Sequence, residues 1–197
     1  MTGMDRDSEL ALVSRLRAGD AEAFDAVHDC FNTRLFNFLA RLSRRREIAE
    51  DLLEETWLRL VARAPHLQTD TRLGPWLFTV ARNLYVSYRR SRLLEDSHAV
   101  GLIGLWPSGS APPSPFDLAA ASETGGRIEA AMAALPVAYR EALLLVLVEG
   151  MRPIDAAAVC GISPDAMRQR LSRARMAMAA SLDADDPAVI ALREVTT

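Results

Sequence analysis

Arginine, glutamine and serine side chains gather near the start of the last predicted helix, residues 164–182. Arginine and glutamine form paired hydrogen bonds with guanine and adenine edges in the major groove of DNA, and the first residues of a recognition helix reach deepest into that groove. The residues predicted to read bases are Arg168, Gln169 and Ser172. Arginines that bind phosphates add affinity and salt dependence without reading sequence. The candidates for that role are Arg170, Arg173 and Arg175.

The segment before this helix has the sequence of a helix-turn-helix. Gly161 suits the turn, Ser163 is a preferred N-cap residue, and Pro164 suits the first helical position. The preceding helix, predicted over residues 153–159, is rich in alanine and permits close helix contact. An arginine-rich helix without this turn would suit a solvated surface equally well, so the turn is the feature that favours DNA binding.

Charge is distributed unevenly along the chain. The 197 residues include 23 basic and 26 acidic side chains, and the net charge of −3 does not by itself indicate nucleic-acid binding. Residues 73–94 and 166–182, however, each hold four arginines and no acidic residue, whereas residues 47–55 are rich in aspartate and glutamate. The pattern indicates two positive faces and separate negative ones.

Apolar residues recur at three- and four-residue steps, which is the spacing of amphipathic helices. The first half contains predicted helices over residues 8–18, from the N-cap Asp20 to about Leu42, over 46–64, and from Pro75 onward. The second half contains predicted helices over residues 128–135, 137–149, 153–159 and 164–182. We therefore expect an all-α fold of two small helical domains joined by a flexible linker, with the helix-turn-helix in the C-terminal domain.

Three apolar stripes are expected to face inward. On the helix over residues 46–64 the stripe is Ala49, Leu53, Thr56, Trp57 and Leu60. On the helix that begins near Pro75 it is Leu77, Val80, Ala81, Leu84 and Tyr88. On the last helix it is Met167, Leu171, Ala174 and Met178.

The segment between the two halves is rich in glycine, serine, proline and alanine, a composition that does not readily pack or form regular structure. This predicts four parts of the chain. They are a helical domain over residues 8–95, a linker over 96–126, a helix-turn-helix domain over 127–183 and a C-terminal tail over 184–197.

The composition argues against an enzyme, a metal centre and a membrane span. Three histidines lie in unrelated settings, and no phosphate-binding loop or nucleophile motif accompanies the acids, so we predict no catalytic residue, cofactor or metal. The two cysteines, Cys30 and Cys160, have no neighbours at ligand spacing. The apolar run Ala142 to Val148 is too short to cross a bilayer, and residues 1–8 do not resemble a secretory signal. We expect a cytoplasmic protein without membrane insertion.

Motifs in both halves resemble the extracytoplasmic-function (ECF) sigma factors of the sigma-70 family. Residues 135–136, 139–145, 149–151 and 161–175 look like the C-terminal DNA-binding domain of that family. Residues 49–57 (Ala-Glu-Asp-Leu-Leu-Glu-Glu-Thr-Trp) resemble its polymerase-binding helix, and residues 76–84 (Trp-Leu-Phe-Thr-Val-Ala-Arg-Asn-Leu) its promoter-melting segment. The motifs occur in the same order as in the family, across about residues 10–182. The resemblance implies a sigma factor that directs RNA polymerase to promoters.

The resemblance also implies roles for particular residues. The acidic helix would dock on a coiled coil of the polymerase largest subunit through Asp51, Glu54, Glu55 and Leu58. The minus-ten element would be read by the loop over residues 66–74 and the helix after it. There Asn83 would bond an unstacked base, and Arg82, Arg89, Arg90 and Arg92 would hold the strand. Trp76 is expected in the core, and the last helix would read the minus-thirty-five element. The implied partners are core RNA polymerase, promoter DNA and an anti-sigma factor.

Departures from the family pattern leave the promoter sequence open. Glu54 stands where the family usually has glutamine, and residues 164–169 differ from the commoner recognition-helix sequence. The main alternative is a helix-turn-helix regulator that binds duplex DNA without polymerase. A third interpretation is an adaptor that uses both domains to bind another protein. The acidic helix and the segment over residues 75–92 favour the sigma factor.

Overall fold

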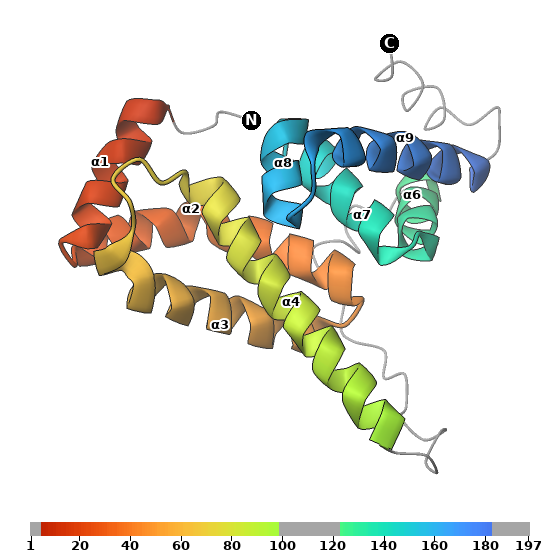
Figure 1. Cartoon of the computed structure of the whole chain (residues 1–197), viewed down its shortest axis with the longest axis horizontal. Helices are drawn as coiled ribbons and strands as arrows, with labels where there is room; N and C mark the ends of the chain where they lie inside the picture. The colour runs from red at the N-terminus through yellow and green to blue at the C-terminus, as the bar shows by residue number, and fades with distance from the viewer. Residues whose placement is uncertain (1–4, 99–122, 183–197) are drawn as a thin grey trace. The chain divides into compact units, whose positions relative to one another are not determined.

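The computed structural model describes residues 5–98 and 123–182, and all of the regular structure in these two ranges is helical. The chain divides into two compact units, Met1–Pro107 and Ser108–Thr197. The expected all-α fold is therefore confirmed (Figure 1). The predicted tail lies outside the described residues, as does most of the predicted linker. The two ends of that linker, residues 96–98 and 123–126, belong to helices.

The described part of the first unit, residues 5–98, contains four α-helices and one short 3-10 helix. They are α1 (Arg6–Arg17), α2 (Ala21–Ser43), α3 (Arg46–Arg63), η1 (Ala64–His66) and α4 (Leu73–His98). Helix α2 packs against α1, α3 and α4, and α4 also packs against α3 (Figure 1). The rings of Phe38 in α2 and Phe78 in α4 meet edge to face with centroids 5.2 Å apart, and both side chains are fully buried. Burial of such side chains is the main stabilising term of a small helical domain.

Local sequence fixes where these helices begin and end. Asp5 and Asp20 are the N-caps of α1 and α2, and each accepts hydrogen bonds from two backbone N–H groups of its helix. The Nε of Arg15 donates to Asp20 Oδ2 at 2.6 Å, and this bond is the largest cause that lowers the pKa of the Asp20 carboxyl. Gly19, with φ +78°, makes the turn between α1 and α2. The predicted N-cap at Asp20 is confirmed.

Two of the predicted apolar stripes need correction. On α3 Leu52 is buried together with the predicted Ala49, Thr56, Trp57 and Leu60, whereas Leu53 is only half-buried. On α4 the buried side chains are Leu73, Leu77, Phe78, Ala81 and Tyr85. The predicted members that are only half-buried are Val80, Leu84 and Tyr88. Because α4 packs on α2 as well as on α3, its buried stripe is turned toward Phe78 and Tyr85, and the Tyr85 hydroxyl donates to the Leu42 carbonyl at 2.9 Å.

The second unit contains the helix-turn-helix. Its elements are α6 (Glu123–Ala134), α7 (Val137–Leu143), a π-helical turn η2 (Leu144–Val148), α8 (Pro153–Cys160) and α9 (Pro164–Ala180). Gly161 adopts φ +65° in the turn, and the Ser163 hydroxyl accepts from the Ala166 N–H at 3.1 Å. The predicted turn, N-cap and inward stripe of α9 are all confirmed, since the four stripe residues are buried.

A buried arginine ties α7 to the end of α6. Arg140 is 4% exposed, and its guanidinium donates to the carbonyls of Met132, Ala133 and Leu135 at 2.7 to 3.1 Å. The last carbonyls of a helix have no partner within the helix, so a cation placed there satisfies them and also suits the negative end of the helix dipole. In the described ranges no helix is both long and apolar enough to cross a membrane.

Candidate functional site

The predicted site residues of the first unit lie on two faces of the α3 and α4 pair. One face, on the outside of α3, carries exposed leucine and valine side chains next to acids. Leu58 is 57% exposed and Val61 is 56% exposed, and Glu54 and Asp51 are exposed one and two turns before Leu58. We call Asp51, Glu54, Leu58 and Val61 the docking face. Large apolar side chains that are exposed together in a small domain mark a binding surface.

Glu55 differs from the other predicted acids of this helix. It is half-buried, and its Oε1 accepts from the Nε of Arg59 at 2.7 Å, one turn along α3. Glu50 likewise accepts from Arg46 at 2.7 Å. Their charges are thus partly balanced within α3. The negative potential of the docking face therefore rests mainly on Asp51 and Glu54.

An apolar groove between α2 and α3 overlaps the docking face. Its volume is about 370 Å³, and it is lined by Phe24, Glu50, Leu53, Glu54, Trp57, Leu58 and Val61. Trp57 forms its floor: the indole N–H donates to Asn32 Oδ1 at 3.0 Å, and the ring lies within 5.9 Å of Phe24 and 4.9 Å of His28 between centroids. An apolar groove with acids at its edge suits a partner helix that presents apolar side chains and basic residues. Sequence reasoning did not include Phe24 or Val61 in this surface.

The opposite side of the α3 and α4 pair holds a second hollow, which we call the α3–α4 cleft. Its volume is about 470 Å³, and it is lined by Arg59, Arg63, Trp76, Val80, Asn83, Leu84 and Ser87. Asn83 is exposed at this cleft. Trp76 is only half-buried and lines the cleft, so the expectation of a core tryptophan is not met. An aromatic ring, an amide and two guanidinium groups are the side chains that bind unstacked nucleotides.

The predicted arginines of α4 lie near the cleft and beyond it. Arg82 is half-buried, and its Nη1 lies 3.5 Å from Asn83 Oδ1. Arg89 and Arg90 are exposed about two turns further along α4. Because residues seven positions apart share a helix face, Arg90 extends the face of Asn83 and Arg89 that of Arg82. The positive surface thus continues along α4 away from the cleft.

Sequence reasoning missed the two arginines that α3 contributes to the cleft. Arg59 and Arg63 lie one turn apart near the end of α3, a helix whose first half is acidic. They line the α3 side of the cleft, and Asn83 lines the α4 side. Their four-residue spacing places them on one face, and this was the signal that could have identified them. This spacing was overlooked because the acidic residues in the first half of α3 made the whole segment look like a negative surface.

The predicted residues of α9 separate into an exposed group and an inward group. Arg168, Gln169, Ser172 and Arg173 are exposed, and we call these four the recognition face. Arg168 forms an ion pair with Asp165 in the same turn. The four side chains stand at the start and middle of a helix capped by Ser163, which is the part of a recognition helix that reaches base edges.

Arg170 and Arg175 are turned toward the body of the second unit. The Nη1 of Arg170 lies 3.5 Å from Glu141 Oε2, and the two side chains are 22% and 5% exposed. The Nε of Arg175 is buried and has no hydrogen-bond acceptor among the described residues. A guanidinium that is committed to a buried carboxylate is poorly placed for a phosphate, so the prediction for Arg170 is not supported by its position.

Comparison with known proteins identifies a family for each half of the chain. Residues 27–93 match the family described as Sigma-70 region 2, and residues 125–178 match the family described as Sigma-70, region 4. The chain is 34% identical over 188 residues to the ECF RNA polymerase sigma factor EcfG of Rhodopseudomonas palustris, a match that covers 94% of this chain and 88% of that protein. It is 30% identical over 156 residues to SigM of Bacillus subtilis, covering 79% and 93%.

The fold is also similar to that of a solved sigma factor. The structure of RpoE in complex with the anti-sigma factor NepR from Bartonella quintana superposes with a TM-score of 0.63 at 27% identity. The match covers 91% of this chain and 97% of the solved chain.

Proposed function

The chain belongs to the ECF sigma factors of the sigma-70 family, and we propose that it divides the work of a sigma factor among the docking face, the α3–α4 cleft and the recognition face. A sigma factor is not an enzyme. It binds core RNA polymerase and directs transcription initiation at specific promoters. The observation that carries the proposal is that one helix, α3, presents an acidic and apolar face on one side and two cleft arginines on the other.

The docking face binds core polymerase in this proposal. Leu58 and Val61 supply apolar area, which contributes about 25 cal/mol for each Å² removed from water. Asp51 and Glu54 are exposed at its edge, where they attract a basic partner and fix its orientation. Glu55 contributes less than expected from the sequence alone, because Arg59 already balances its charge.

The α3–α4 cleft holds the unstacked bases of the minus-ten element. Trp76 stacks on a base, Asn83 forms paired hydrogen bonds with a base edge, and the cleft arginines bind the strand's phosphates. Arg82, Arg89 and Arg90 continue the phosphate contacts along α4. Stacking on an aromatic side chain contributes about 1–3 kcal/mol per base, which offsets the cost of removing that base from the duplex.

The recognition face reads the minus-thirty-five element in duplex DNA. Arg168 and Gln169 are the base-reading residues, with Ser172 beside them, and Arg173 binds a phosphate. Arg170 is left out of this set because it pairs with Glu141. Arg175 is left out because its Nε is buried.

The likeness to a sigma factor solved with its anti-sigma factor supports control by such a partner, and membership of the sigma-70 family supports action in the cytoplasm. The chain is held inactive by an anti-sigma protein until a signal releases it, and it acts in the cytoplasm, where polymerase and promoters are. The apolar groove between α2 and α3 is a surface that such a protein would cover, because covering it also blocks the docking face.

Charge reversal of the docking face tests the proposal. The double variant Asp51→Arg/Glu54→Arg should bind core polymerase at least about tenfold more weakly, since like charges across an interface cost several kcal/mol. The matched control is Asp29→Arg, an exposed acid of α2 whose side chain is 88% accessible, and it should bind as the wild type does. Competition for core polymerase against a labelled sigma factor measures both. Equal binding by wild type and double variant would show that this face is not where polymerase docks.

A further inference from the structure

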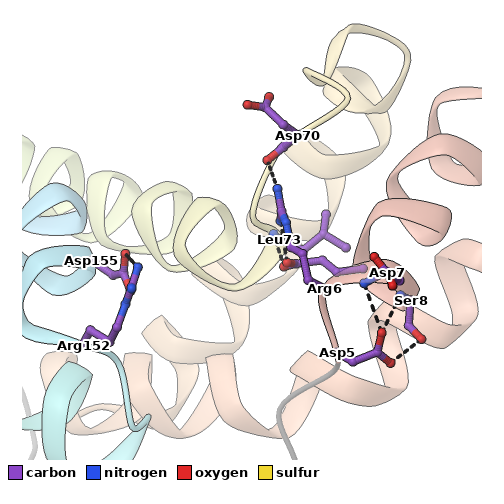
Figure 2. Close-up of polar contacts among 9 residues, drawn as sticks. Asp5, Arg6, Asp7, Ser8, Asp70, Leu73, Arg152 and Asp155 are labelled. Carbon is purple, nitrogen blue, oxygen red and sulfur yellow. Dashed lines mark hydrogen bonds and ion pairs between the residues drawn. The ribbon is translucent and has the colours of Figure 1, made fainter.

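The first helix holds the loop that precedes α4. This loop, residues 67–72, connects η1 to α4 and contains most of the segment predicted to read the minus-ten element. Arg6 Nη2 donates to the Asp70 carbonyl at 2.7 Å, and the Leu73 N–H donates to Glu9 Oε1 at 2.8 Å. Arg6 Nη1 also donates to Glu9 Oε2 at 2.8 Å. Figure 2 shows Arg6 reaching from α1 to Asp70, with Leu73 beside it.

Helix α4 needs an acceptor at this position. The first N–H groups of a helix have no acceptor within the helix, and a side-chain oxygen just before the helix usually supplies one. The Arg72 carbonyl accepts from the Trp76 N–H at 3.0 Å, which makes Arg72 the N-cap of α4. An arginine side chain has no acceptor atom. Glu9 of α1 accepts instead from the Leu73 N–H, the first N–H group of α4, and its negative charge also suits the positive end of the α4 dipole.

The two α1 residues that make these contacts are themselves well anchored. Asp5 caps the first turn of α1 by accepting from the N–H groups of Asp7 and Ser8, and the Ser8 hydroxyl donates to Asp5 Oδ2 at 2.6 Å (Figure 2). The hydrogen bond from Ser8 is the largest cause that lowers the pKa of Asp5. The Glu9 side chain is 15% exposed, so its bonds to Arg6 and Leu73 are partly shielded from water.

The backbone segment that Arg6 and Glu9 hold, residues 70–73, continues directly into residues that line the α3–α4 cleft. Leu73 is fully buried, and Trp76, which lines the cleft, is three residues further along the same helix. A shift of the first turn of α4 would therefore move Trp76 and change the loop in front of it. Sites that read single bases depend on such fixed geometry.

We propose that Arg6 and Glu9 are positioning residues for promoter reading: they hold residues 70–73 in the conformation in which the loop and the start of α4 read the minus-ten element. This inference rests on the proposed function of the α3–α4 cleft. Neither side chain contacts DNA in the proposal. They act through the backbone of Asp70 and Leu73.

Three variants of full-length protein, assembled with core polymerase, test this inference. Glu9→Ala removes the acceptor, Glu9→Gln keeps an oxygen for the Leu73 N–H, and Arg6→Ala releases the Asp70 carbonyl. The matched control is Arg15→Ala, which breaks an ion pair of α1 with Asp20 at the other end of the helix, away from the loop. Each protein is measured for core polymerase affinity and for initiation across a promoter library randomised at the minus-ten element.

The expected result distinguishes an effect on promoter reading from an effect on polymerase binding. Glu9→Ala should lower initiation roughly fivefold, as expected for the loss of a helix cap, and should flatten the base preference within the minus-ten element. Its affinity for core polymerase should stay within about twofold of the wild type, since the docking face is on α3. Arg6→Ala should show the same effect at smaller size. Glu9→Gln and Arg15→Ala should retain the wild-type base preference.

Asn83→Ala in the same library distinguishes this inference from the proposed function beneath it. If Asn83→Ala changes the base preference and Glu9→Ala does not, the positioning role is wrong and the cleft assignment stands. If neither changes it, both are wrong. A Glu9→Ala protein that loses polymerase affinity and initiation to the same degree would also contradict the inference, because that result reports general damage to the first unit.

Discussion

The two surfaces proposed to bind DNA are built in different ways. The recognition face belongs to one helix, and its geometry needs only the buried stripe that holds α9 in place. The α3–α4 cleft is built from two helices: α3 belongs to an acidic segment of the chain and α4 to a basic one. The loop before α4 is held by a third helix, α1. One exposed helix suits the groove of an intact duplex, whereas a cleft with an aromatic wall suits bases that have left the duplex.

The largest expected effect tests whether the two units depend on separate cores. Arg140→Ala should destabilise the second unit by about 3 kcal/mol, because three carbonyls at the end of α6 lose a charged donor in a buried position. Trp57 and Trp76 lie in α3 and α4, and residues 108–197 contain no tryptophan, so the fluorescence of these two side chains reports on the first unit. During urea unfolding the helical circular dichroism should fall early while the fluorescence transition stays in place. The control Arg173→Ala, on the recognition face, should shift neither.

The next effect concerns stacking, which only the cleft is proposed to use. Trp76→Ala should reduce promoter opening about tenfold or more, since an aromatic platform contributes roughly 1–3 kcal/mol per base. Trp76→Phe should keep most of the opening rate because it retains a flat ring. Opening is followed by the reactivity of unpaired thymines, and binding to core polymerase serves as the check on folding. If the alanine variant opened promoters normally, Trp76 would be only a packing residue at the edge of the core.

A smaller effect compares the salt dependence of the two surfaces. Arg63→Gln should reduce the slope of log affinity against log salt by about 0.7 on a promoter whose minus-ten region is already single-stranded. Arg173→Gln should reduce it by about 0.9 when the minus-thirty-five region is duplex. Each variant should leave the other probe unaffected. Holoenzyme binding to the two probes at several salt concentrations measures both slopes, and an Arg63 effect on the duplex probe alone would remove this residue from the cleft assignment.

The smallest expected effect is on the pH dependence of stability, and it comes from the residues that cap the helices. Asp20 caps α2 with a carboxylate whose pKa is lowered in the folded protein, mainly by the hydrogen bond from Arg15, whereas α9 is capped by the Ser163 hydroxyl, which does not titrate. A lowered pKa means that this contribution to stability is fully present above the unfolded-state pKa of about 3.9 and is lost as the pH falls below it. The urea midpoint of the first unit should therefore drop less between pH 6 and pH 3 in Asp20→Asn than in the wild type. An equal drop in both proteins would show that Asp20 does not contribute to this acid sensitivity.

The parts of the structure set by local chemistry could be predicted from the sequence. The Asp20 cap, the turn at Gly161, the Ser163 cap and the buried stripe of α9 each depend on residues within a few positions of one another. The membership of both halves in the sigma-70 family was likewise visible, because each of the motifs that resemble the family is contiguous in the chain.

The remaining features depend on which helices meet, and short-range patterns do not contain that information. The apolar spacing of α4 does not show that the helix packs on both α2 and α3, so the burial of Phe78 and Tyr85 and the place of Trp76 at the cleft were not predicted. Arg170 turns inward because Glu141, 29 residues away, lies beneath it. Arg63 joins the cleft only because α3 lies beside α4, and the Glu9 contact to Leu73 spans 64 positions.

The most direct test of the division of labour is promoter melting measured with and without core polymerase. A promoter selected from a library carries a fluorescent adenine analogue in its minus-ten element, and the signal rises when that base leaves the stack. We predict a rise with wild-type protein only when core polymerase is present, and no rise with Asn83→Ala even though that variant still binds the polymerase. Tight and specific binding of the free wild-type protein to the intact promoter, or normal melting by Asn83→Ala, would contradict the account.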